Sequence, residues 1–266
     1  MRKLKKIITT LLLVMLLTSC EKEENFSGTT ESFNLQSNDN GANYTIKVAL
    51  PVNYNPTNQK YATIYVLDGD ENFDLVATKC NDLAMKYATA NVLVVSIGYG
   101  NDRSIDYTPS TNETDLGANQ FLNFIETQLI PKIEQDFSAA AFRESRVILG
   151  HSYGGLFGAY AFSTRNNVFG NYILLSPSLW YNNLDVLKLE KGNRENNKMQ
   201  NQLVFMGIGQ MENSGRMQAP FEAFYQSLHD NYTQIKIEKN REANLDHVGS
   251  KNPNITKGLD FYFLNR

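Results

Sequence analysis

Cysteine, histidine and tryptophan are scarce in this chain. Two of its 266 residues are cysteines, three are histidines and one is tryptophan. No group of Cys, His or carboxylate residues has the spacing of a zinc site, so we predict neither a metal nor a cofactor. Cys20 is expected to be consumed in N-terminal processing, which leaves Cys80 alone in an apolar stretch. An intramolecular disulfide is therefore excluded, and Cys80 is predicted to be a small core residue.

Positive charge is also in short supply. The chain has 25 Lys and Arg against 28 Asp and Glu, for a formal net charge of −3. Four of the positive charges, on Arg2, Lys3, Lys5 and Lys6, lie at the N-terminus, and the remainder forms no basic stripe. A nucleic-acid partner is therefore excluded, because phosphate binding needs clustered Lys and Arg.

Long apolar runs are missing except near the N-terminus. Residues 7–17 form an apolar run that is too short to span a bilayer, and they follow the basic segment. Residues 17–20 (Leu-Thr-Ser-Cys) are similar to a bacterial lipobox, in which the cysteine is acylated and becomes the new N-terminus. We predict a lipoprotein signal peptide over residues 1–19, lipidation of Cys20, and a flexible tether over residues 20–31. An ordinary secretory signal with a chance cysteine is the alternative.

The charged residues 21–24 bear on localisation. They resemble the acidic export signal of some bacterial surface lipoproteins, although any solvated tether can carry such charges. The expected protein is a membrane-anchored lipoprotein, periplasmic or on the outer-membrane surface. Acyl chains on Cys20 would make the membrane a partner, since each buried methylene contributes about 0.8 kcal/mol.

Beyond residue 31 the sequence alternates strand and helix patterns, which predicts one α/β domain over residues 32–266. Continuous apolar runs fit strands buried on both faces of a parallel sheet. Patterns that alternate apolar and polar residues fit half-exposed edges, namely a hairpin over 32–36 and 43–50 and a last strand over 234–238. Together they predict a mostly parallel eight-stranded sheet with helices on both faces. The continuous runs are 62–67, 92–97, 147–149, 172–175 and 203–208.

Helices are predicted where apolar residues recur at helical spacing. They cover residues 116–137, with a kink at Pro131, and residues 217–228 and 255–264. Residues 182–201 are polar and are expected to form a short connection without an apolar lid.

A nucleophile elbow is the strongest functional signal. Gly150, Ser152 and Gly154 form a G-x-S-x-G pattern between the strand 147–149 and an apolar helical stretch over 156–162. In such an elbow the serine adopts a strained backbone conformation that exposes its Oγ, and its neighbours must be small. The alternative is a purely structural strand-to-helix turn. We predict that Ser152 is a catalytic nucleophile.

A serine nucleophile needs a base, and the three histidines allow elimination. His151 adjoins the nucleophile and cannot fold back to accept its proton. His229 lies beside Asp230 in an amphipathic helix, where a surface role is the ordinary interpretation. His247 lies in a loop after the last predicted strand, and we predict that it is the base.

The acid that orients the base is less tightly constrained. Glu212 follows the strand 203–208 and is the predicted triad acid. Asp246 is adjacent to His247 and badly placed to orient it, while Asp185 is the fallback. A Ser–His dyad without an acid is the alternative. The oxyanion hole is predicted from the backbone N–H groups of Tyr153 and Asp70, although residues 68–70 also fit a simple turn.

Residues 65–70, 150–155, 176–180 and 247–250 are similar to motifs of the esterase-D-like family of α/β-hydrolases. That family includes siderophore trilactone esterases, feruloyl and acetyl-xylan esterases, and mycolyltransferases. The resemblance implies an α/β-hydrolase fold with Ser152 as nucleophile and His247 as base. It also implies Glu212 as the acid, which some siderophore esterases are described as lacking.

The same resemblance implies a substrate-binding arginine at Arg103, for which an ion pair with Asp106 is the alternative. Trp180 and Tyr153 would offer flat faces to the substrate, although Trp180 could equally be a core anchor. The predicted function is metal-independent ester hydrolysis through an acyl-enzyme, on siderophore trilactones or polysaccharide-linked acyl esters. The alternatives are an acyltransferase and a non-catalytic surface protein that binds glycans or siderophores. The sequence makes no prediction about the oligomeric state.

Overall fold

The computed structural model describes residues 26–109, 117–197 and 202–266. The predicted signal peptide, Cys20 and the first part of the tether lie outside these residues. Phe26 belongs to the segment predicted as a flexible tether, but its ring packs against Phe73 (ring centroids 6.2 Å apart) and its N–H donates to Asp74. None of the helices in the described part of the chain combines the length and apolar character needed to cross a membrane.

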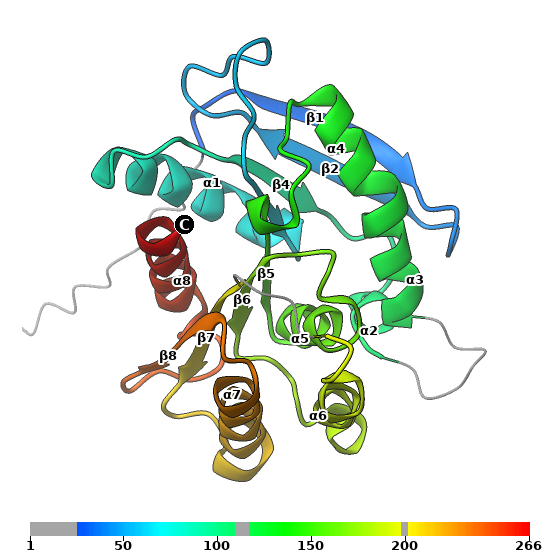
Figure 1. Cartoon of the computed structure of the whole chain (residues 1–266), viewed down its shortest axis with the longest axis vertical. Coiled ribbons are helices and arrows are strands. Elements are labelled where there is room, and N and C mark those ends of the chain that lie inside the picture. Colours follow the sequence, from blue (N-terminus) through cyan, green and yellow to red (C-terminus); the bar gives the residue numbers. More distant parts are fainter. Residues whose placement is uncertain (1–25, 110–116, 198–201) are drawn as a thin grey trace, which may run out of the picture.

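The core of the protein is an eight-stranded sheet with the strand order β1-β2-β4-β3-β5-β6-β7-β8 (Figure 1). The hairpin strand β2 is antiparallel to both β1 and β4, and every other neighbouring pair is parallel. The predicted mostly parallel α/β-hydrolase sheet is therefore confirmed. The strands are β1 (Thr30–Gln36), β2 (Asn43–Ala49), β3 (Thr63–Val66), β4 (Leu93–Ile97), β5 (Arg146–His151), β6 (Asn171–Leu175), β7 (Gln202–Gly209) and β8 (Ile235–Glu242).

Burial explains why the strand patterns in the sequence differ. Every residue of β3, β4 and β6 is buried, because helices cover both faces, and these strands read as continuous apolar runs. The strands β2 and β8 alternate in exposure, as the period of two in the sequence predicts. The strands β1 and β8 form the two edges of the sheet, which confirms both edge predictions.

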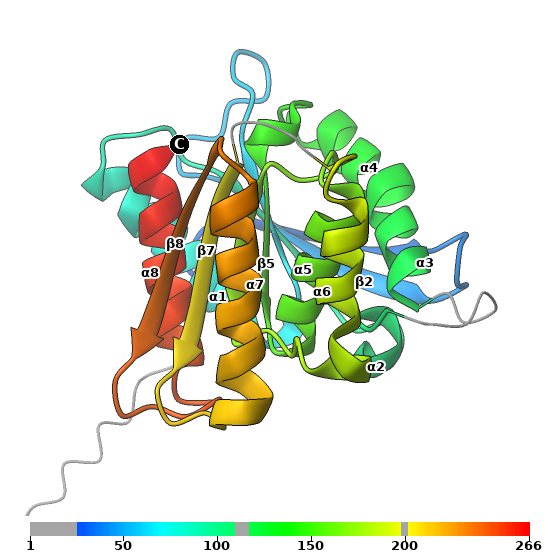
Figure 2. The same ribbon diagram turned by 60° about the horizontal axis from the view of Figure 1, so that its bottom comes forward.

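Two layers of helices enclose the sheet. α1 and α8 lie together on one face, and α3 to α7 cover the other face (Figures 1 and 2). Cys80 lies on the buried face of α1, as predicted. The helices are α1 (Gly69–Lys86), α2 (Arg103–Asp106), α3 (Gly117–Phe124), α4 (Ile130–Asp136), α5 (Tyr153–Arg165), α6 (Tyr181–Asn193), α7 (Ala219–Asn231) and α8 (Lys251–Asn265), with a 3₁₀ turn at Arg143–Ser145.

Two helical predictions need correction. The helix expected over 116–137 is divided by a π-helical turn, Ile125–Leu129, which ends just before Pro131. Proline has no N–H to donate, so regular i→i−4 bonding cannot continue through this position. The connection expected over 182–201 contains α6, a helix that the sequence pattern did not predict.

The polar character of α6 explains why its pattern was missed. Of its residues only Val186 and Glu190 are buried. The carboxylate of Glu190 accepts hydrogen bonds from Arg194, Ser227 and Tyr232, so this helix is fixed partly by a polar cluster rather than by an apolar stripe. A second π-helical turn, Ser214–Gln218, precedes α7.

Candidate active site

Ser152 occupies a strained turn between β5 and α5. Its backbone has φ 60° and ψ −114°, a conformation that residues other than glycine rarely adopt. The backbone N–H of Ser152 donates to Leu175 O at the end of β6, and its own carbonyl accepts from Leu156 N and Ser178 N. The elbow is therefore held from both sides, and the strain is sustained by surrounding structure.

Glycine is required in the elbow for steric reasons. A Cβ on Gly150 would lie 2.4 Å from the backbone of Gly154, and one on Gly155 would lie 2.9 Å from Leu175 O. These contacts are with backbone atoms, which cannot rotate away as a side chain can. The small residues that flank Ser152 therefore allow β5, β6 and α5 to approach closely.

We expect Gly150→Ala to lower the free energy of unfolding by about 3 kcal/mol or more, because the new Cβ forces β5 and α5 apart. Urea denaturation of purified protein measures the change. Gly192→Ala is the matched control: Gly192 is exposed in α6, with no other atom within 4 Å of an added Cβ. That substitution should leave stability unchanged or raise it by up to about 1 kcal/mol. Equal effects of the two substitutions would contradict the steric explanation.

The loop after β8 brings His247 to the elbow. Nε2 of His247 lies 3.0 Å from Oγ of Ser152, although the residues are 95 positions apart in the chain. Both residues follow strands whose carboxyl ends share one edge of the sheet, which is why they can meet. The His247 side chain is 36% exposed, so a bound molecule can reach the same imidazole nitrogen.

Glu212 lies on the other side of the His247 ring. Its Oε2 is 2.8 Å from Nδ1 of His247, while its Oε1 accepts hydrogen bonds from the Ser176 hydroxyl (2.6 Å) and the Gly209 N–H (2.8 Å). Burial raises the pKa of Glu212, but the hydrogen bonds from His247, Ser176 and Gly209 outweigh it and hold the pKa below its ordinary value of 4.5. The carboxylate therefore stays ionised and fixes the Nδ1–H tautomer of His247.

Two backbone contacts explain how Glu212 and His247 come together. Gln210 N donates to Glu242 O, and Met211 N donates to Leu245 O. The turn after β7 is thereby joined to the loop after β8. The fallback acid, Asp185, lies on α6 and bonds to Asn182 and Lys188 instead of to His247. His229 bonds to Asp230 on the exposed face of α7.

His151, which the sequence excluded as the catalytic base, holds the residue that is predicted to act as the base, His247. Its Nε2 donates to the backbone carbonyl of His247 at 2.9 Å, and the two rings lie 4.7 Å apart. Burial, and to a smaller extent the neighbouring His247, lowers the pKa of His151 from 6.5 to about 4. His151 is therefore neutral near pH 7 and adds no second positive charge next to the base.

The half-buried His151 predicts a pH dependence of stability. Between pH 6.5 and about 4 the unfolded chain binds a proton at His151 that the native state does not, so acid favours unfolding in this window. The loss amounts to about 3 kcal/mol, since each pKa unit corresponds to about 1.4 kcal/mol. Urea denaturation of wild type and His151→Phe at pH 7, 6, 5 and 4 should show a shallower decline in the variant. Parallel declines would contradict the assignment.

The predicted oxyanion donors are both in first turns of helices. Tyr153 is the first residue of α5 and Asp70 the second residue of α1, positions whose N–H groups have no acceptor within the helix. The Asp70 side chain accepts from Tyr99 N, in the loop after β4, at 3.2 Å, so the group that Asp70 could offer to an oxyanion is its backbone N–H. The role of both N–H groups stays a prediction.

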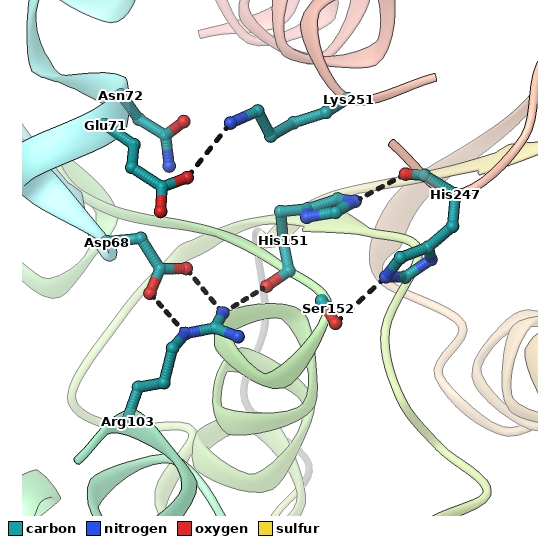
Figure 3. Close-up of a pocket in the computed structure, with 8 residues that line it drawn as sticks. All are labelled: Asp68, Glu71, Asn72, Arg103, His151, Ser152, His247 and Lys251. Carbon is teal, nitrogen blue, oxygen red and sulfur yellow. Dashed lines mark hydrogen bonds and ion pairs between the residues drawn. The ribbon is translucent and has the colours of Figure 1, made fainter. Parts of the chain in front are cut away.

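Arg103 pairs with Asp68 and not with Asp106. Its Nε and one terminal nitrogen bond to the two Asp68 oxygens at 2.7 and 2.8 Å, and that terminal nitrogen also donates to His151 O (Figure 3). Asp106 instead accepts from the Tyr44 hydroxyl at 2.8 Å. The Asp106 alternative is therefore wrong, and Arg103 links the start of α1 to the elbow. A substrate contact by Arg103 stays a prediction.

Two cavities meet at Ser152 and His247. The smaller, of about 230 Å³, is lined by charged groups that include Asp68, Arg103 and Lys251 (Figure 3). The larger, of about 500 Å³, is lined by Tyr153, Ser178 and Trp180 and by the turn that carries Glu212 and Arg216. Trp180 is half-buried and faces this cavity, whereas Arg216 was not singled out from the sequence.

Ser152, His247 and Glu212 form a hydrogen-bonded chain through which a proton can pass from the hydroxyl to the imidazole. A hydroxyl, an imidazole and a buried carboxylate lie in sequence, with 3.0 and 2.8 Å between partners, and this geometry activates a hydroxyl for attack on a carbonyl group. In the part of the chain that the structure describes, no three or more His, Cys, Asp or Glu side chains are grouped so that they could hold a metal ion.

Several known proteins with similar sequences are named as siderophore esterases. The chain is 33% identical over 186 residues to a siderophore triacetylfusarinine C esterase of Aspergillus fumigatus, which covers 64% of this chain and 63% of the relative. It is 31% identical over 162 residues to an apo-salmochelin esterase of Escherichia coli, covering 53% of this chain and 48% of that protein. The chain thus spans less than two thirds of the length of both relatives.

A relative that matches over more of the chain and a solved structure also support similarity to esterases of this kind. The ferri-bacillibactin esterase BesA of Bacillus subtilis is 28% identical over 225 residues, covering 75% of this chain and 77% of the relative. The crystal structure of the BES protein from Bacillus cereus superposes with a TM-score of 0.78 at 28% identity, covering 91% of this chain and 98% of that one. The sequence profile described as "Putative esterase" matches residues 37–247, and the chain therefore belongs to that esterase family.

Proposed function

We propose that this protein hydrolyses carboxylic esters through an acyl-enzyme formed on Ser152. The observation that carries the proposal is the contact chain from Ser152 Oγ to His247 Nε2 (3.0 Å) and from His247 Nδ1 to Glu212 Oε2 (2.8 Å). Three separate segments supply these groups, and neither of the two bonds is needed to complete a helix or a strand. Membership of the esterase family supports the same reaction.

In the first half of the reaction, Ser152 Oγ attacks the ester carbonyl carbon while its proton passes to Nε2 of His247. Glu212 stabilises the imidazolium that results. The Oγ–C bond forms, the carbonyl electron pair moves onto oxygen, and the N–H groups of Tyr153 and Asp70 bind the oxyanion. The ester C–O bond then breaks, His247 returns the proton to the departing alcohol, and the acyl group remains on Ser152.

In the second half, water replaces the alcohol. His247 takes a proton from the water as its oxygen attacks the acyl carbon, and a second tetrahedral intermediate forms at the same donors. The C–Oγ bond breaks, Ser152 recovers a proton from His247, and the carboxylic acid leaves. Because the larger cavity is open and holds about 500 Å³, the alcohol can leave without rearrangement of the fold.

We propose siderophore esters, including trilactones, as the substrate class. Support comes from the names of three relatives, which are esterases of triacetylfusarinine C, of apo-salmochelin and of ferri-bacillibactin. Support also comes from the two adjoining cavities, both lined by Ser152 and His247, which give room for the parts of a bulky ester.

Partition of the acyl group between water and methanol tests the proposed mechanism. Two esters that share an acyl group but carry different alcohols should give the same ratio of acid to methyl ester, because both pass through one acyl-enzyme. Product ratios are measured by liquid chromatography at several methanol concentrations. Ratios that depend on the original alcohol, or the absence of hydrolysis across nitrophenyl acetate and a siderophore trilactone, would contradict the proposal. Dominant methyl ester formation at low methanol would favour an acyltransferase.

We also propose that the mature protein is a lipoprotein anchored in a membrane through Cys20. The lipobox-like residues 17–20 after a short apolar run support this location. In detergent phase separation of cells that express the full chain, wild type should enter the detergent phase and Cys20→Ser the aqueous phase. The same partition for both proteins would contradict the anchor.

A further inference from the structure

An arginine and the only tryptophan of the chain form one wall of the larger cavity. The guanidinium carbon of Arg216 lies 3.6 Å from the centroid of the Trp180 ring. Tyr153 is the next ring in the row, with its centroid 6.4 Å from that of Trp180. All three residues line the cavity that contains Ser152 and His247. A group bound against this wall is therefore close enough to belong to the ester that Ser152 attacks.

The two arginines of this cavity differ in how their charges are balanced. Arg103 is neutralised by the carboxylate of Asp68, with which it forms two hydrogen bonds. Arg216 forms no ion pair with any carboxylate in residues 26–109, 117–197 or 202–266. Its positive charge is exposed at the cavity and stacks on Trp180, but no carboxylate of the described residues neutralises it.

The carboxylates in the same cavity are engaged elsewhere. Both oxygens of Glu212 accept hydrogen bonds, from His247 on one side and from Ser176 and Gly209 on the other. Asp246 is exposed, and its Oδ1 accepts from the N–H of Gly249 within its own loop. In the described part of the chain, neither carboxylate forms an ion pair with Arg216.

Stacking on Trp180 gives the Arg216 guanidinium a preferred orientation. A guanidinium that lies over an aromatic face keeps the N–H groups at its edge free, and these match the paired oxygens of a carboxylate or a deprotonated catechol. The turn that carries Arg216 is itself fixed, because the Asn213 side chain accepts from Arg216 N at 2.8 Å. The site is therefore organised before a ligand binds.

We propose that this wall, formed by Arg216, Trp180 and Tyr153, binds a planar, negatively charged part of the substrate. The preferred esters are then those that carry an aromatic acid or an ionised phenol, in preference to neutral esters of the same shape. This inference rests on the proposed function, in that it takes the group bound at the wall to be part of an ester positioned at Ser152. The Arg216 edge bonds to the negative oxygens, and the ring packs along the aromatic row.

Trp180 provides a direct measurement, since it is the only tryptophan and its fluorescence reports on this wall alone. The probes are 4-nitrobenzoate and its neutral counterpart 4-nitrobenzamide, which both quench tryptophan on contact and carry no ester. We expect 4-nitrobenzoate to bind wild type at least about 10-fold more tightly than 4-nitrobenzamide, a ratio that corresponds to about 1.4 kcal/mol. In Arg216→Met the two dissociation constants should differ by less than about 2-fold.

Two further variants separate the contact from general charge effects. Arg216→Lys keeps the charge but loses the planar fork, and it should retain only part of the preference. Arg241→Met removes an arginine on β8 that pairs with Glu222 and lines neither cavity, and it should retain the full preference. N-Acetyltryptophanamide corrects for absorption by the probes.

Equal affinities of wild type for the two probes, no quenching by either of them, or an unchanged preference in Arg216→Met would each overturn the inference. The assay requires no turnover, so its outcome is separate from that of the esterase proposal. Ester hydrolysis without the anion preference would contradict this inference alone. Anion binding without hydrolysis of any ester would contradict the proposed function and leave an anion-binding wall.

Discussion

Alanine at position 152 is expected to lower kcat for ester hydrolysis by at least about 10⁴-fold. The substitution removes the oxygen that forms the covalent intermediate, and neither His247 nor Glu212 can act on the ester without it. The remaining activity would come from the oxyanion donors and from substrate binding, so KM should change little. Steady-state kinetics with a nitrophenyl ester give both constants.

Ser178→Ala is the matched control for this prediction. The Ser178 hydroxyl lies 3.4 Å from the Ser152 hydroxyl and lines the same cavity, but it has no contact with the base. Its removal should reduce kcat by less than about 10-fold, because it deletes one weak hydrogen bond. Circular dichroism should show both variants folded. Activity of Ser152→Ala within 100-fold of wild type would contradict a nucleophilic role.

Glutamine at position 212 should also cost about 10⁴-fold in kcat, although it preserves the shape of the side chain. The Gly209 N–H and the Ser176 hydroxyl both donate to Oε1, so the amide oxygen of Gln must occupy that site. The amide NH₂ then faces Nδ1 of His247 and donates to it. His247 is left with its proton on Nε2, the nitrogen that must accept a proton from Ser152.

Ser176→Ala separates the tautomer effect from general disruption of the site. It removes one hydrogen bond to Glu212 and leaves the carboxylate and the Gly209 bond in place, so kcat should fall by only about 10-fold. If Glu212→Gln stayed within 10-fold of wild type, the Ser152–His247 pair would be sufficient and the site would work as a dyad.

The sequence predicted those parts of the protein that depend on local pattern or on elimination. The period of the apolar residues identified the buried and edge strands, because burial acts on each strand separately. The elbow could be found from Gly150, Ser152 and Gly154, since the steric demand lies within five consecutive residues. With only three histidines in the chain, fold order was enough to choose His247.

Contacts that depend on how helices and loops pack were missed. The only partner that the sequence offered for Arg103, as the alternative to a substrate contact, was Asp106, three residues away. In the structure Arg103 instead bonds to Asp68, 35 positions earlier in the chain. The hydrogen bond from His151 to His247 O depends on the conformation of the loop after β8, which has no sequence signature. The pair of Arg216 and Trp180 joins two turns that follow different strands, and only the sheet order brings these together.

The most direct measurement of the central claim is the site of reaction with a fluorophosphonate, which modifies a serine only when a base has activated it. Mass spectrometry of peptides from wild type should place a single adduct on Ser152. The adduct should be absent from Ser152→Ala and should form far more slowly in His247→Ala. An adduct on another residue, or equal rates of labelling with and without the His247 imidazole, would contradict the claim that His247 activates Ser152.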